Sequence, residues 1–154
     1  AQASRLRELY QEIYIKKHSA LNAQYTTQFF SDVVQAHVMQ VLSLRNKAGE
    51  IMAFAMLYQQ EDTLTVPALG YDTQVGIEGL YRLLFAAIHH YAQTHKLLLN
   101  YSSGAGDFKR KRGGVPRMEY TLLRSPSAWQ RGFFSWLESK TAMIQAHHLI
   151  DLGA

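Results

Sequence analysis

The sequence predicts an α/β domain with a mixed, largely antiparallel central sheet and helices on both faces. Three segments rich in apolar and β-branched residues, at 41–44, 51–58 and 63–69, are separated by short turn segments and predict antiparallel strands. A long amphipathic segment at 77–94 then leads into a short apolar segment at 97–101. This order is typical of a helix that crosses over a sheet between two strands, so we expect strands of both directions.

Two amphipathic helices are expected before the sheet. The first should begin after an N-cap at Ser4 and run to about His18. Its apolar stripe consists of Leu6, Leu9, Tyr10 and Ile13. The second should begin after an N-cap at Thr26 or Thr27. Its stripe consists of Phe29, Phe30, Val33 and His37.

The second half of the chain supplies the remaining elements. The helix over 77–94 has an apolar stripe of Leu80, Leu83, Leu84, Ala87, Ile88 and Tyr91. The apolar run at 97–101 predicts a buried central strand, and 118–123 predicts a further strand. A last helix is indicated by Ser125, Pro126, Trp129, Phe133, Trp136 and Leu137. We therefore expect one domain over 1–124 and a helical extension of the same domain over 125–154.

Composition excludes several classes of function. The 154 residues are 47% hydrophobic and 18% charged, which suits one globular domain, and no apolar run approaches the ~20 residues of a membrane span. Cysteine is absent, which excludes disulfides, thiolate catalysis and cysteine–zinc sites and fits a reducing, cytoplasmic compartment. The neighbouring pairs His89-His90 and His147-His148 cannot ligate one metal from one helix face, so no metal site is expected. The nucleophile elbow of hydrolases and the phosphate loop of NTPases are also missing.

The first candidate site joins the third strand to the long helix. It reads Gly70-Tyr71-Asp72-Thr73-Gln74-Val75-Gly76-Ile77-Glu78-Gly79-Leu80. The free N–H groups and positive dipole end of a helix start suit a diphosphate, and glycines let a ligand approach the backbone. The alternative is that these glycines only shape a loop. Pro67, just before, cannot donate a ladder hydrogen bond, so we expect an edge, a bulge or a divergence of strands there.

The second candidate site is the segment 100–114, which follows the short strand. It combines hydroxyls, glycines and a basic cluster, and the stretch from Asp107 to Arg124 holds six basic and two acidic residues, the whole net charge of +4. Helical spacing would place Phe108 on one face with Arg112 and leave another face basic. The segment could hold a phosphorylated ligand, and the alternative is a solvated, basic short helix.

Four short phrases carry a resemblance to a known family. They are Gly70 to Thr73, Gly79 to Arg82, Ser102 to Ala105, and Phe108 to Gly113 followed by Glu119-Tyr120. With the strand order, they resemble the GNAT acyltransferases, and within these the subgroup related to the C-terminal domain of Fem-type peptidoglycan aminoacyltransferases. The resemblance spans about Leu9 to Leu123.

The resemblance implies an N-acyltransferase that moves an acyl group, expected to be acetyl, from a CoA thioester to an unidentified amine. The thioester would lie where two strands diverge, with its pantetheine arm along 63–69 and its diphosphate on the amides of 74–80. Backbone N–H groups of 68–70 would stabilise the oxyanion. The candidate base is Asp72 or Glu119, and the candidate acid is Tyr101 or Tyr120. The candidate donor-binding residues are Leu69, Gly70, Gln74, Val75, Gly76, Ile77, Gly79, Leu80, Ser102, Ser103, Lys109 and Arg112.

Two other functions stay open at this point. Fem-type relatives use aminoacyl-tRNA, and the basic segment 109–117 would suit an RNA backbone or an acyl carrier protein as the donor. Alternatively, the domain is a non-catalytic scaffold, which the two tryptophans and the phenylalanine of the last helix suggest. That helix is also the expected contact with a second copy of the chain or with a partner domain.

Overall fold

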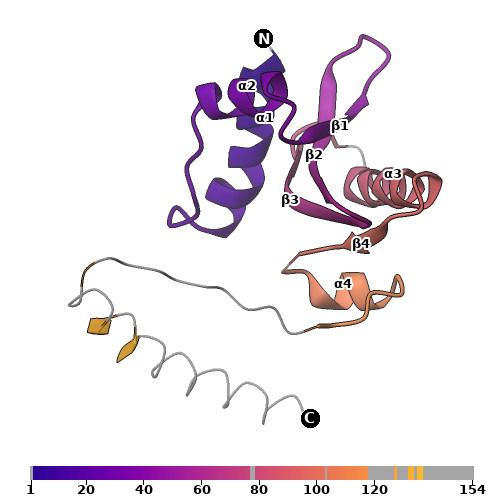
Figure 1. Ribbon diagram of the computed structural model, residues 1–154. Coiled ribbons are helices and arrows are strands. Elements are labelled where there is room, and N and C mark those ends of the chain that lie inside the picture. The colour runs from indigo at the N-terminus through magenta and orange to yellow at the C-terminus, as the bar shows by residue number, and fades with distance from the viewer. Residues whose placement is uncertain are drawn as a thin grey trace. The chain divides into compact units, whose positions relative to one another are not determined.

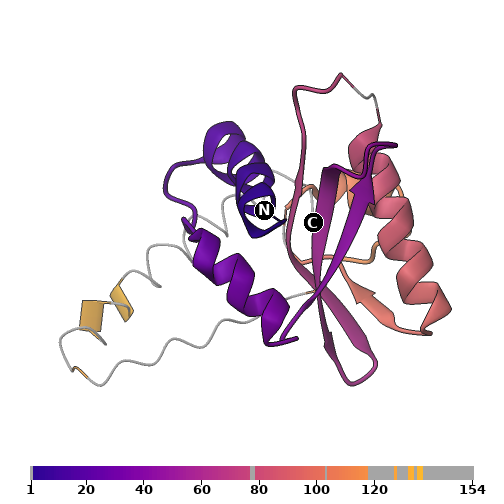
Figure 2. The same ribbon diagram turned by 90° about the horizontal axis from the view of Figure 1, so that it is seen from above.

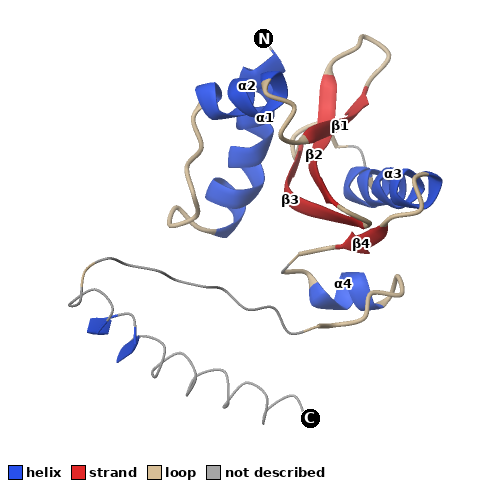
Figure 3. Cartoon of the chain, viewed as in Figure 1, coloured by secondary structure: helices blue, strands red, loops and turns tan. Residues whose placement is uncertain are grey.

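The computed structural model describes residues 2–76, 79–102, 104–117, 127, 132–133 and 135–136. The chain divides into two units, Ala1–Gly114 and Val115–Ala154, and the first unit carries the sheet (Figures 1 and 3). Its elements in order are α1 (Gln2–Tyr10), the π-helix η1 (Gln11–His18), α2 (Thr27–Gln35), β1 (Gln40–Arg45), β2 (Ile51–Gln60), β3 (Thr63–Tyr71), α3 (Leu80–Thr94), β4 (Leu98–Asn100) and α4 (Gly106–Arg110). No helix in these described ranges is long and apolar enough to cross a membrane.

The sheet has the order β1-β2-β3-β4, with the first three strands antiparallel and β4 parallel to β3. The predicted mixed sheet with one crossover helix is therefore confirmed. The prediction of a buried central strand at 97–101 is wrong: β4 is the edge of the described sheet, and Leu98 is 61% exposed. Only its neighbours Leu97 and Leu99 pack against the core, because adjacent strand residues face opposite sides.

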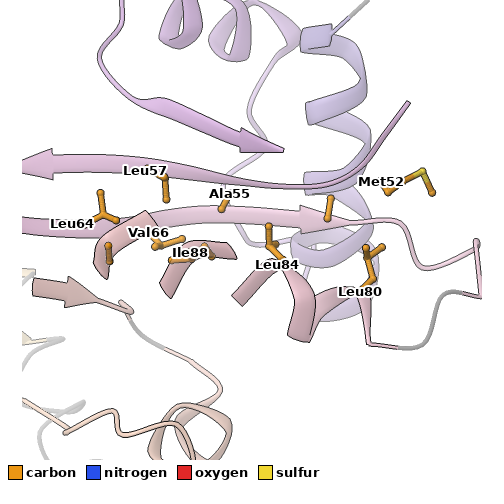
Figure 4. Packing of buried hydrophobic residues seen from close by; sticks show 10 residues of the cluster. Met52, Ala55, Leu57, Leu64, Val66, Leu80, Leu84 and Ile88 are labelled. Carbon is orange, nitrogen blue, oxygen red and sulfur yellow. The ribbon is translucent and has the colours of Figure 1, made fainter. Parts of the chain in front are cut away.

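Helices cover both faces of the sheet, as predicted (Figure 2). On one face, α1 and α2 pack against β2 through a core that includes Phe54 and Met56. On the other face, α3 packs against Ala55 and Leu57 of the same strand (Figure 4). The unbroken burial of β2 from Ile51 to Leu57 follows from this arrangement, because a strand with helices on both faces must be apolar on both.

A β-bulge interrupts β3 at Pro67. Met56 pairs with Ala68, but Tyr58 pairs with Thr65, so Leu57 alone lies opposite Val66 and Pro67. The alternation of faces changes at this point. Val66 packs on the α3 side of the sheet, whereas Ala68 packs on the α1 side. The exposed proline thus occupies the extra position, as its missing N–H requires, and the predicted bulge is confirmed.

The first two helices depart from the predicted boundaries in two places, the start of the first and the end of the second. The first begins at Gln2, so Ser4 is not its N-cap, and its second half is a π-helix. The second helix is capped by Thr26, whose Oγ1 accepts the Phe29 N–H at 3.1 Å, which confirms one of the two alternatives. Its predicted stripe residue His37 lies beyond the helix end, with a left-handed φ of 52°.

The stripe of α3 is rotated from the predicted one. Leu84 and Ile88 are fully buried, but Leu83 is 57% exposed and Phe85 is buried in its place. The reason is that Phe85 packs against the rings of Tyr101, just after β4, and Phe108 of α4, which spacing along the helix alone does not reveal. Two predictions fall outside the described residues, namely the strand at 118–123 and the helix start at Ser125-Pro126.

Candidate functional site

The site is built around the edge of β3 that faces β4. The two strands pair only from Thr63 to Thr65, opposite Leu98 to Asn100, and no described strand pairs with the β4-facing edge of β3 from Val66 to Tyr71. On the β4 side the chain turns away at once, because the Asn100 Oδ1 accepts the Ser102 N–H at 2.7 Å and Ser102 has a φ of 59°. A bulge increases the local twist of a strand, so the bulge at Pro67 accounts for the divergence on the β3 side. The predicted separation of strands just past residue 66 is confirmed.

Tyrosines from three elements gather at this open edge. The Leu69 backbone N–H donates to the hydroxyl of Tyr14 on η1; burial raises the pKa of Tyr14, and this hydrogen bond lowers it in part. The Tyr71 ring lies 5.5 Å from the Tyr81 ring of α3, and the Lys17 ammonium donates to the Tyr71 hydroxyl at 3.2 Å. Burial, followed by the nearby Tyr71 and Tyr14, raises the pKa of Tyr81. Phenol groups from both faces of the sheet therefore meet beside the unpaired backbone of β3.

Sequence reasoning missed Tyr14 and Tyr81. Both residues lie within helices at positions that the apolar stripes leave out. A tyrosine in a helix more often packs in a core than takes part in a reaction. The structure is needed to show that Tyr14 and Tyr81 lie close together, on either side of β3. The one available signal was the phrase Gly79-Leu80-Tyr81-Arg82, which contributed to the family resemblance.

An aromatic cluster fastens α4 to α3 behind the open edge. The Phe108 ring of α4 lies 4.8 Å from Tyr81 and 5.0 Å from Phe85, and Phe85 stacks on Tyr101 at 5.8 Å. The Tyr101 hydroxyl is hydrogen-bonded to Nε2 of His89, and burial raises the pKa of Tyr101. Since His89 lies nine residues into α3, roughly 13 Å along its axis, this hydroxyl is directed away from the helix start. The geometry favours packing over proton donation for Tyr101.

The basic segment turns out to be largely self-contained. Lys109 donates to the carbonyl oxygens of Tyr101 and Ser102, both at 2.9 Å. The Arg112 guanidinium lies 3.4 Å from the centre of the Phe108 ring and donates to the Phe108 carbonyl at 2.9 Å. These contacts hold α4 against the end of β4, so the predicted anion-binding role of Lys109 and Arg112 is not carried into our proposal. Ser103 lies outside the described residues.

The loop after β3 is tied to the first helix. Oδ1 of Asp72 accepts the Gln74 N–H at 2.8 Å, and Oδ2 accepts a hydrogen bond from Arg5 at 2.5 Å. Burial would raise the pKa of Asp72, but the hydrogen bonds from Arg5 and from the Gln74 and Val75 amides, with the charge of Arg5, outweigh it and lower the pKa. Such a carboxylate is a poor proton acceptor at neutral pH, so we do not retain Asp72 as the base.

Beyond this loop lies an uncapped helix start. Gly76 and Gly79 have left-handed φ values of 64° and 84°, and a Cβ built on either would meet nothing within 4 Å. Gly79 precedes α3 and has no side chain to cap it, and the first turn of α3 carries no acidic residue. The first N–H groups of such a helix lack intrahelical acceptors and attract anions. Ile77, Glu119 and Tyr120 lie outside the described residues.

Comparisons of the fold identify the architecture. The tetramutant of the BH1408 protein from Bacillus halodurans superposes with a TM-score of 0.59 at 19% identity, over 79% of this chain and 93% of that one. A ribosomal-protein-alanine N-acetyltransferase from Brucella melitensis superposes with a TM-score of 0.57 at 14% identity, over 80% and 94%. An aminoglycoside N-acetyltransferase solved in complex with CoA gives 0.58 at 9% identity, over 82% and 90%.

The chain has the GNAT fold. No protein-family model matches the sequence, and a search of curated proteins finds no relative. At these identities the GNAT likeness concerns the fold alone. The geometry of the β3 edge and of the helix start beside it is therefore the basis for inferring an activity.

Proposed function

We propose that this chain is an N-acyltransferase that moves an acyl group, expected to be acetyl, from a CoA thioester to an amine. The observation that carries the proposal is the divergence of β3 from β4 after a three-residue ladder, at a bulge made by Pro67. A parallel pair of strands that opens in this way leaves backbone groups of β3 without partners on the side that faces β4, and such groups are costly wherever they are shielded from water. A ligand with amide groups would satisfy them.

The exposed backbone fits the shape of an acyl-CoA. The amides of a pantetheine arm can add to the open edge of β3 between Val66 and Tyr71, as an extended peptide adds to a sheet. The diphosphate can then reach the start of α3, where Gly76 and Gly79 leave open space over the backbone. Among the predicted donor-binding residues, we retain Leu69, Gly70, Gly76, Gly79 and Leu80.

Tyr14 is our candidate for the proton donor. Its hydroxyl already accepts the Leu69 N–H, within the backbone stretch expected to stabilise the oxyanion, and its raised pKa keeps it protonated at neutral pH. In the reaction the amine nitrogen bonds to the carbonyl carbon, the carbon–sulfur bond breaks, and the sulfur takes the Tyr14 proton. The proton lost by the amine passes to a base; Glu119 stays the candidate base and Tyr120 the alternative acid on the strength of the sequence alone.

The finer resemblance to the Fem-related subgroup stays part of the proposal, and it is carried by the phrase Phe108 to Gly113. A Cβ on Gly114 would lie 2.9 Å from the Lys109 carbonyl oxygen, so glycine is required there, and Lys109 itself holds the end of β4. Lys109 and Gly114 thus have a structural use that is independent of the donor. The amine acceptor stays unidentified.

Calorimetry with CoA and acetyl-CoA, followed by assay of thiol release on a panel of amines, tests the proposal. We expect saturable binding of both and turnover with at least one amine. Tyr14→Phe should lower kcat by about 10²-fold, the usual effect of losing a general acid, and less for a thioester whose thiol is more acidic. Tyr58→Phe is the control, since Tyr58 is an exposed side chain at the end of β2. Failure of CoA and every acyl-CoA to bind would overturn the proposal.

A further inference from the structure

We propose that Asp72 and Arg5 are positioning residues that hold the loop after β3 in the shape that receives the diphosphate of the donor. The inference rests on the proposed function and deepens it. It gives the acidic residue of this loop a role other than base, and it assigns a role in donor binding to α1, which covers the opposite face of the sheet from α3 (Figure 2).

Asp72 folds the loop back on itself. Its carboxylate accepts the backbone N–H groups of Gln74, at 2.8 Å, and of Val75. Its own N–H donates to the Met52 carbonyl at 2.8 Å, which extends the pairing with β2 by one residue. An aspartate that accepts the amide two residues on forms an Asx turn, a local constraint on the backbone that no other side chain of the loop supplies in the described residues.

The Gln74 amide is consequently occupied by Asp72, and the Val75 amide is directed to the same carboxylate. They are not available to a diphosphate, although the sequence predicted them as donor-binding residues. The groups left facing open space are Gly76 and the start of α3. Asp72 thus decides which amides of the loop remain for the ligand.

Arg5 anchors this turn to the rest of the protein. Its Nη2 donates to Oδ2 of Asp72 at 2.5 Å and its Nε donates to the Ile51 carbonyl at 3.0 Å. A second tie comes from Glu12, seven residues after Arg5, which accepts a hydrogen bond from the Thr73 hydroxyl at 2.9 Å. Both ties come from α1 and η1, so the loop is held by side chains outside itself.

Arg5 also offsets the negative charge of Asp72. A carboxylate beside a diphosphate repels it, and the repulsion is strongest where water is partly excluded. The Asp72 side chain is only 14% exposed, and the guanidinium in contact with it cancels most of its charge. The pair therefore shapes the loop without placing net negative charge at the donor site.

A truncated donor separates positioning from catalysis. Acetyl-CoA carries the diphosphate, whereas S-acetyl-N-acetylcysteamine ends within the pantetheine arm and lacks it. For Asp72→Asn we expect KM for acetyl-CoA and Kd for CoA to rise about tenfold, the effect of one or two lost interactions, with kcat retained. The kcat/KM for the truncated donor should stay within about twofold of the wild type, since no diphosphate has to be bound.

Two further variants complete the design. Arg5→Gln should raise KM for acetyl-CoA similarly, and the double variant Arg5→Gln with Asp72→Asn should be no worse than the worse single one, since the two act as a unit. Glu8→Gln is the control, because Glu8 contacts the same arginine at 3.2 Å but not the loop. Glu8→Gln should leave KM for acetyl-CoA and kcat/KM for the truncated donor unchanged.

Equal losses on both donors in Asp72→Asn would mean a base or a general structural role, and would overturn the inference. An unchanged Kd for CoA in that variant would overturn it as well. These outcomes are distinct from failure of the proposed function, in which the wild-type protein itself would bind no CoA.

Discussion

Replacement of Gly70 by alanine tests the packing between β3 and α1. A Cβ at this position would lie 2.6 Å from the carbonyl carbon and oxygen of Leu9 and 2.7 Å from Cε1 of Phe54. Carbon atoms in contact prefer separations of roughly 3.5–4.0 Å, so α1 or β3 would have to move by about 1 Å. Gly70 has no left-handed φ, so the cost is one of packing and not of backbone conformation.

The expected loss of stability can be bounded. Overpacking a close-packed core costs about 1–3 kcal/mol, and restriction of the unfolded chain by alanine returns about 0.4–1 kcal/mol. Because two of the three clashing atoms are backbone, we expect the upper half of this range, a net loss of about 2 kcal/mol. For a chain of this size that is roughly 4–8 °C in Tm, measurable by thermal and urea denaturation.

Two variants give this prediction a control and a refutation. Gly106→Ala should be neutral or stabilising, since a Cβ there would meet only the flexible end of Arg110, at 3.3 Å. Shortening Phe54 to Leu in the Gly70→Ala background should not restore stability, because the Leu9 backbone stays in place. A Gly70→Ala protein within about 0.5 kcal/mol of the wild type, the usual spread of neutral substitutions, would show that α1 does not pack this closely.

Three further predictions concern stability. Lys109→Met should cost about 1–2 kcal/mol, because two backbone carbonyls lose their donor, whereas Lys111→Met should be neutral; urea denaturation measures both. Thr26→Ala should cost about 1 kcal/mol through loss of the N-cap, whereas Thr27→Ala should cost less, as thermal melts would show. The pKa of Asp72 is lowered on folding, so its stabilising effect is present above its ordinary pKa of 3.8 and is lost as the pH falls through the folded value. Asp72→Asn should therefore flatten the acid limb of a plot of Tm against pH.

Each of these has an outcome that contradicts it. Equal effects of the two lysine variants would mean that the carbonyl contacts do not hold α4. Equal effects of the two threonine variants would remove the assigned cap. An unchanged acid limb in Asp72→Asn would show that the ion pair with Arg5 contributes no pH-dependent stability.

The sequence predicted those features that depend on local chemistry. Pro67 predicted an edge, a bulge or a divergence of strands, because a residue without an N–H cannot donate a ladder hydrogen bond. The turn residues predicted where the strands end. Features that depend on partners distant in sequence could not be predicted. The Arg5–Asp72 pair joins positions 67 residues apart. The acceptors of Lys109 are backbone carbonyls, which every residue has, so nothing in the sequence indicated that this lysine has partners within the protein and it was predicted to bind an anion.

Deletion of Pro67 should remove the opening between β3 and β4 while leaving the fold intact. Without this residue, Val66 would pair with Leu57 and every observed pair from Ala68 to Tyr71 with β2 would keep its register. Both cores would keep their residues, since Val66 and Ala68 already face opposite sides. The deletion removes only the bulge, and with it the extra twist that carries β3 away from β4.

The deletion variant should therefore remain folded, with a Tm within several degrees of the wild type, but should lose affinity for CoA by at least about tenfold, or 1.4 kcal/mol. Pro67→Ala is the matched control, because it keeps the extra residue and should keep the bulge and the affinity. Circular dichroism and calorimetry measure the two properties separately. A folded deletion variant that binds CoA as tightly as the wild type would mean that the bulge does not create the donor site, and the divergence of the strands would then need another cause, such as the turn at Asn100.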